Sequence, residues 1–132
     1  MVVVPPDLTP EELAFLQSTF DLARAGDVPT LVEYVDAGVP VNLTNGAGDT
    51  LLILAAYHVH HDLVRELLAR GADHARVNDR GQTALASAVF RRHPGIVTDL
   101  LDAGADPELG DRSAVAIATF FELPDMLAML RR

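Results

Sequence analysis

Two series of glycine residues recur in this chain at a single spacing. Gly38, Gly71 and Gly104 are evenly spaced along the sequence (71 − 38 = 33; 104 − 71 = 33), and the last two each begin the sequence Gly-Ala-Asp. Gly48 and Gly81 keep the same interval at a second phase (81 − 48 = 33), and each precedes a threonine by two positions. A fixed period of this size is typical of stacked units that pack mainly on their neighbours.

The apolar residues between these glycines have helical spacing and predict two short helices in each unit. In the clearest unit, Leu63, Val64, Leu67 and Leu68 lie on one face of the second helix. At the start of the chain, a Thr-Pro-Glu-Glu sequence has the form of a helix-starting capping box. The predicted helices span residues 10–25, 28–37, 51–57, 61–70, 83–90, 95–103 and 124–130, with one more within 111–118.

The last unit is shorter than the others. The sequence from Asp111 to Ala118 echoes the sequence from Asp79 to Ala86 at an interval one short of the period (111 − 79 = 32). We therefore expect one residue to be missing from the connection that leads into this unit. A modified final unit is typical of repeat proteins, because it must meet water on one side.

Composition excludes several classes of protein. With 132 residues and 49% hydrophobic residues, the chain has the length and composition of one globular domain. Its net charge of −9 disfavours binding to nucleic acid or to an anionic membrane. Without cysteine, disulfides and thiolate chemistry are excluded. Since no signal peptide or membrane-spanning run is found, we expect a cytoplasmic protein.

The combined motifs identify a family that the chain resembles. The sequence Gly48-Asp49-Thr50-Leu51-Leu52-Ile53-Leu54-Ala55-Ala56, followed by His60 to Asp73, is similar to the ankyrin-repeat pattern G-x-T-P-L-H-x-A-A and G-H-x-x-I-V-x-x-L-L-x-x-G-A-D. The resemblance implies a mainly α, ankyrin-repeat solenoid of helix-turn-helix units linked by β-hairpin-like loops. It further implies a small protein of bacterial type, with about four repeats including degenerate terminal caps.

The period sets the boundaries of the expected units within one domain, residues 1–132. These are a capping helix segment at 8–19, a partial first repeat at 20–45, full repeats at 46–78 and 79–110, and a shortened capping repeat at 111–132. The chain departs from the family pattern at the glycine that ends the first helix of each repeat. Val59 and Arg92 occupy this position here.

The resemblance also implies where a partner protein would bind. In ankyrin proteins, partners meet the hairpin tips and the outer positions of the first helices, which line a concave groove. Tyr57 and Phe90 are one period apart (90 − 57 = 33), so they should stack; the alternative is that they only cover the backbone of the next repeat. The candidate partner-binding residues are Thr44, Ala47, Asp49, Tyr57, His58, Val77, Arg80, Gln82, Phe90, Arg91 and Glu122.

Other candidate sites are weaker. The histidines His58, His60 and His61 could bind zinc or nickel, but His60 occupies a structural position of the family pattern. The glycines at 46–48 lack the spacing and the lysine of a phosphate-binding loop. Charged residues at 62–70 are interpreted as a solvated helix face.

The sequence thus favours a non-catalytic module that binds a protein partner, with no cofactor, no catalytic residues and no metal site. We expect a monomer or a weak homo-oligomer. The alternative is a dedicated accessory, inhibitory or immunity-type subunit that modulates an enzyme or a toxin, and a minor alternative is a metal-binding protein built on the histidine cluster.

Overall fold

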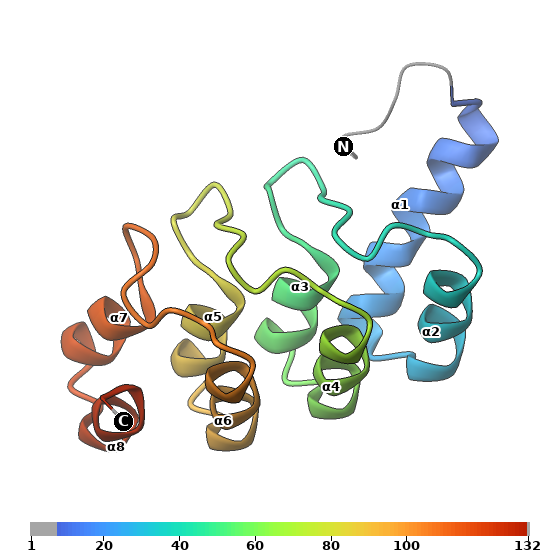
Figure 1. The fold of residues 1–132 in the computed structure, drawn as a ribbon. Helices are drawn as coiled ribbons and strands as arrows, with labels where there is room; N and C mark the ends of the chain where they lie inside the picture. The colour runs from blue at the N-terminus through green and yellow to red at the C-terminus, as the bar shows by residue number, and fades with distance from the viewer. Residues whose placement is uncertain (1–7, 132) are drawn as a thin grey trace.

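The computed structural model describes residues 8–131, which form a stack of helical pairs (Figure 1). Helices α3, α5 and α7 are the first helices of their repeats, and α4, α6 and α8 are the second helices; α1 and α2 form the N-terminal pair. The connections into the first helices project from the same side of the stack (Figure 1). The helices are α1 (Pro10–Ala25), α2 (Val28–Asp36), α3 (Leu51–Tyr57), α4 (His61–Ala69), α5 (Ala84–Phe90), α6 (Pro94–Asp102), α7 (Ala114–Phe120) and α8 (Pro124–Leu130).

Each first helix begins at a hydroxyl residue that caps it. The side chains of Thr50, Thr83 and Ser113 accept hydrogen bonds from backbone N–H groups three residues later, at 3.0–3.1 Å. At the start of α1, Thr9 and Glu12 form the predicted capping box, with both hydrogen bonds at 3.1 Å. These caps satisfy backbone donors that a helix start leaves unpaired, and they fix where each repeat begins.

The structure corrects the offset of the last repeat. Helix α7 begins at Ala114 and α5 at Ala84, so the offset is 114 − 84 = 30 rather than 32. Ser113 therefore occupies the capping position of Thr83, and three residues are missing instead of one. The shared Asp-Arg sequence at 79–80 and 111–112 gave the wrong alignment because it lies in the connection from which residues were lost.

Small and aliphatic side chains together form one continuous core. Helix α3 is buried along its length up to Ala56, and the alanines of the first helices allow neighbouring repeats to approach closely. The second helices bury one face only, for example Leu63, Val64 and Leu67 of α4, all at 0% exposure. Each fully buried aliphatic side chain contributes about 1.5–3 kcal/mol, so the stack is stable where its single repeats would not be.

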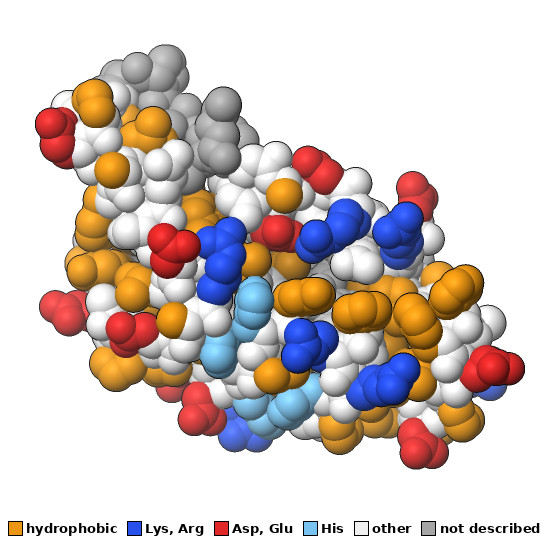
Figure 2. Space-filling view, turned by 180° about the vertical axis from the view of Figure 1, so that it is seen from behind, with side chains coloured by type: hydrophobic (Ala, Val, Ile, Leu, Met, Phe, Trp, Pro, Cys, Tyr) orange, Lys and Arg blue, Asp and Glu red, His pale blue; other side chains and the backbone are white. Residues whose placement is uncertain are grey.

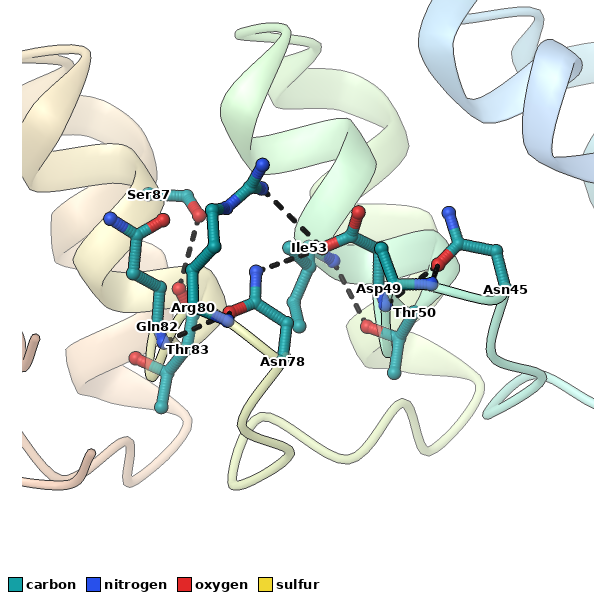
Figure 3. A network of polar contacts seen from close by, with 10 residues as sticks. Asn45, Asp49, Thr50, Ile53, Asn78, Arg80, Gln82, Thr83 and Ser87 are labelled. Carbon is teal, nitrogen blue, oxygen red and sulfur yellow. Dashed lines mark hydrogen bonds and ion pairs between the residues drawn. The ribbon is translucent and has the colours of Figure 1, made fainter. Parts of the chain in front are cut away.

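Polar contacts join neighbouring repeats at the hairpins (Figure 3). The amide of Asn78 donates a hydrogen bond of 2.8 Å to the carboxylate of Asp49, and its oxygen accepts from the backbone N–H groups of Arg80 and Gln82, both at 3.0 Å. Asn45 makes the same kind of contact with the backbone of its own hairpin. The bond from Asn78 to Asp49 thus fixes one hairpin against the preceding one.

A second set of polar contacts joins the second helices. Asp99 of α6 accepts from His61 at 2.6 Å and from Arg65 at 2.8 Å, both on α4. Arg70 pairs with Asp36, which ends α2, at 2.7 Å and with Glu66 at 2.6 Å. The charged residues at 62–70 therefore do more than form the solvated face that their spacing predicts: two of their arginines connect neighbouring repeats.

The position that ends each first helix lacks glycine, yet its backbone keeps the positive φ that glycine favours. Val59, Arg92 and Glu122 have φ values of 57°, 57° and 53°. A side chain in this left-handed region is strained, most of all a β-branched one.

Among the described residues, no helix has the length and apolarity needed to cross a membrane.

Candidate functional site

A row of aromatic side chains runs across the first helices at their C-terminal ends. Tyr57 and Phe90 close α3 and α5, and their rings stack at 6.1 Å with an angle of 9° between their planes. Phe121 continues the row with its ring 5.8 Å from Phe90, and Phe120 lies 4.9 Å further along. We call Tyr57, Phe90, Phe120 and Phe121 the aromatic row.

The aromatic row is accessible. Phe90 and Phe121 are 40% and 42% exposed, and Phe120 is 79% exposed. Figure 2 shows a run of hydrophobic side chains on this face, with arginine side chains on both sides of it. Stacking of Tyr57 on Phe90 agrees with the sequence prediction, and part of the Phe90 ring is exposed to solvent.

Sequence reasoning missed half of the aromatic row. The offset of 32 placed Glu122, rather than Phe120, in register with Phe90. With the observed offset of 30, Phe120 aligns with Phe90 and Phe121 with Arg91 (120 − 90 = 30; 121 − 91 = 30). The signal that could have revealed this was the hydroxyl residue before each first helix, because Ser113 matches Thr83 and Thr50.

The positions just after the first helices add charge and polarity to the aromatic row. The guanidinium of Arg91 lies over the ring of Tyr57 at 5.4 Å, a distance at which a cation attracts the π-system. The ring of His58 meets Tyr57 edge-on at 5.2 Å. Burial lowers the pKa of His58, and the positive charges of His60, Arg24 and Arg91 lower it further. His58 therefore favours its neutral form.

The remaining candidates lie around the hairpins and differ in exposure. Ala47, Val77 and Arg80 are exposed at or near the tips, whereas Gln82 and Thr44 are partly buried; Thr44 forms a bridge with Thr50 at the base of its hairpin. Asp49 is only 6% exposed and is held by Asn78 and, at 3.7 Å, by Arg80. Its role in the structure is to join two hairpins. Glu122 is exposed, at the strained turn after α7.

A hollow of about 380 Å³ lies at one end of the aromatic row, between α5 and α7. Its walls are mostly apolar, from Phe90, Ala116, Ile117, Phe120 and Phe121. Arg112, Asp111 and Gln82 form its polar edge at the hairpin side. A space of this kind can accept one large apolar side chain of a partner.

The three neighbouring histidines have different partners, although the rings of His58 and His60 stack at 6.4 Å. The Nε2 atom of His60 lies 2.6 Å from the backbone oxygen of Arg24, on the N-terminal side. His61 is bound to Asp99, on the C-terminal side, and His58 lies against Tyr57. Across residues 8–131, no three histidine, aspartate or glutamate side chains are placed to hold a metal ion together.

Comparisons with known proteins agree with this architecture. A family model described as ankyrin repeats (3 copies) matches residues 20–111. The chain is 47% identical over 60 residues to the ankyrin repeat protein PA3287 of Pseudomonas aeruginosa, a match that covers 46% of this chain and 35% of that protein. It is 39% identical over 64 residues to human ankyrin repeat domain-containing protein 29, which covers 48% of this chain and 21% of that protein.

The chain thus matches about a third of the bacterial relative and about a fifth of the human one. Ankyrin repeats are generally protein–protein interaction modules and are typically non-enzymatic. The family model covers more than half of the residues and agrees with the stacked helical pairs. This chain therefore belongs to the ankyrin-repeat family.

Proposed function

We propose that this chain is a non-catalytic module that binds a partner protein through the aromatic row and the neighbouring hairpin tips. The exposure of the aromatic row carries the proposal. A folded chain gains nothing in stability from leaving large rings in water, and clustered exposed apolar surface marks interaction sites. Tyrosine and arginine, which meet at Tyr57 and Arg91, are also frequent energetic anchors of interfaces.

The ring contacts along the aromatic row support the same function. Each ring of the row contacts its neighbour, so the row loses little side-chain freedom when a partner binds. Ordering a free side chain at an interface costs about 0.5–1.5 kcal/mol, and a preorganised surface avoids most of that cost. Buried residues of helices α3, α5 and α7 hold the rings in position.

The proposal is tested by replacing Tyr57 and Phe90 together with alanine. The partner is first identified by affinity capture from the source cell and mass spectrometry, and its affinity is then measured by calorimetry. We expect binding to weaken by about 2–4 kcal/mol while the thermal melt changes little. Phe15→Ala is the matched control, since Phe15 is 41% exposed but lies against Tyr34, away from the aromatic row.

A specialised form of the same function is an accessory, inhibitory or immunity-type subunit. Such a subunit would use the same surface but would recover a single tight partner in the capture experiment. Several weak partners would favour a general binding module. Unchanged affinity of the double alanine variant, with a normal melt, would exclude the aromatic row from both forms.

A further inference from the structure

The arginines of the described residues differ in their ion pairing. Arg24, Arg65, Arg70 and Arg76 form ion pairs of 2.6–3.2 Å. Within residues 8–131, four arginines form none. Two of them, Arg92 and Arg131, do not line the hollow. The other two lie beside the aromatic row: Arg91 over Tyr57 and Arg112 at the edge of the hollow. Arg80, at the neighbouring hairpin, reaches Asp49 only at 3.7 Å and is 55% exposed.

The first helices carry no charge that would oppose these arginines. No aspartate, glutamate, lysine or arginine occurs in α3, α5 or α7. Asp111 is the one carboxylate on the edge of the hollow, and Arg112 lies on the same edge. In a chain of net charge −9, this face therefore offers exposed cations around an apolar strip, alongside the exposed carboxylates of Asp111 and Glu122. Figure 2 shows the arginine side chains on both sides of that strip.

We infer that the partner presents a short acidic segment with a large apolar side chain. The apolar side chain fills the hollow between Phe90, Ile117 and Phe120, and carboxylates on either side of it meet Arg91 and Arg112. Arginine suits this task, because its planar guanidinium binds a carboxylate through two hydrogen bonds. The inference rests on the proposed function and specifies the chemistry of the partner.

Single-stranded nucleic acid is the competing occupant, since its bases stack on aromatic rings and its phosphates pair with arginine. The structure favours the acidic peptide, because the net charge of −9 repels a long polyanion while a short segment meets only the local cations.

A display library of random short peptides tests the inference on the full chain. We expect wild-type protein to select peptides that combine aspartate or glutamate with leucine, phenylalanine or tryptophan. For one selected peptide, Arg91→Gln with Arg112→Gln should weaken binding about tenfold or more. Added salt should weaken binding to the wild type more than binding to this variant. Arg65→Gln removes one positive charge on α4. It is the control for altered net charge and should leave affinity unchanged.

The outcomes separate this inference from the proposed function. If the selected peptides are neutral or basic but lose binding in the Tyr57→Ala, Phe90→Ala variant, the acidic partner is wrong and the binding surface stands. If no peptide distinguishes wild type from that variant, both are contradicted. If oligo-dT binds the aromatic row in place of any peptide, the partner class is wrong. A peptide whose carboxylates are replaced by amides should bind equally to wild type and to the arginine variant.

Discussion

The first-helix side and the second-helix side of this solenoid use charge in different ways. On the second helices, carboxylates and arginines are paired across repeats, as Asp99 is with His61 and Arg65. On the first helices there is no charged side chain, and the arginines that border them at Arg91 and Arg112 form no ion pair within residues 8–131. The charges on one side connect the repeats, whereas Arg91 and Arg112 on the other side are exposed.

This difference means that substitutions on the two sides should have different effects. A change at the second-helix contacts should alter the free energy of unfolding and leave binding intact. A change in the aromatic row should alter binding and leave unfolding nearly unchanged.

The largest effect is expected for Asn78→Ala. This substitution tests how far the division between stability and binding applies at the hairpins. Asn78 is 5% exposed, and its loss leaves the carboxylate of Asp49 and the N–H groups of Arg80 and Gln82 without their hydrogen bonds. We expect destabilisation of about 2–3 kcal/mol by urea denaturation, since unsatisfied buried groups are costly. Gln82→Ala, in the same hairpin, should cost much less. Similar stability of the two variants would show that the hairpin network is not needed to hold the repeats together.

Phe120→Ala should separate binding from stability most clearly. The ring is 79% exposed, so its loss should change the unfolding free energy by less than about 0.5 kcal/mol. It borders the hollow, so binding of the partner should weaken by about 2 kcal/mol. Calorimetric titration and chemical denaturation of the same sample give both values. A large loss of stability with normal affinity would reverse the assignment of Phe120.

Val59→Gly is expected to stabilise the fold by about 1 kcal/mol. The cost of a left-handed conformation is about 1–2 kcal/mol for an L-residue, and the greater freedom of glycine in the unfolded chain removes part of that gain. Arg92→Gly, at the same position of the next repeat, should act in the same direction. The thermal melt is the measurement, and a lower melting temperature in both variants would contradict the strain argument.

Asp99→Ala should destabilise the fold by about 0.5–1 kcal/mol at neutral pH and leave the affinity for the partner unchanged. Burial alone would raise the pKa of Asp99, but hydrogen bonds and charge from Arg65 and His61 outweigh it and hold the pKa below its usual range. The stabilisation is therefore fully present above the unfolded pKa of about 3.9 and is lost as the pH falls through the lower folded pKa. The difference in unfolding free energy between variant and wild type should therefore shrink as the pH falls through this range. A difference that stays constant would argue against the ion pair.

The smallest effect concerns His58. Its lowered pKa means that the unfolded chain binds its proton more readily, so the stability from this group is fully present above about pH 6.5 and declines as the pH falls toward the folded pKa. His58→Gln should remove this dependence, a change of a few tenths of a kcal/mol, in denaturation curves between neutral and mildly acidic pH. An unchanged pH profile would show that another group is responsible.

Most of the fold could be predicted because its causes are local. The threonine caps, the glycine period and the helical spacing of leucine and valine each appear in the sequence within one repeat. The family model and the helices confirm the mainly α ankyrin-repeat solenoid. Helix α1 runs unbroken from Pro10 to Ala25, and the family model begins within it, at residue 20.

The binding surface could be predicted only in part, because it depends on contacts between repeats. The stacking of Tyr57 on Phe90 follows from their period, and the structure agrees. Phe120 and Phe121 were missed because a three-residue loss in the connection shifted the register. The burial of Asp49 and the pairing of Asp99 depend on residues about one repeat away in the sequence, so no single motif reveals them.

The central claim is that a partner meets the aromatic row and leaves the second helices free. Nuclear magnetic resonance titration of the labelled chain with its captured partner tests this directly, residue by residue. We expect shift changes at residues 57–58, 90–91 and 120–121 and at the adjoining hairpins, with α4 and α6 unaffected along their exposed faces. Shift changes concentrated on α4 and α6, with the aromatic row unchanged, would contradict it.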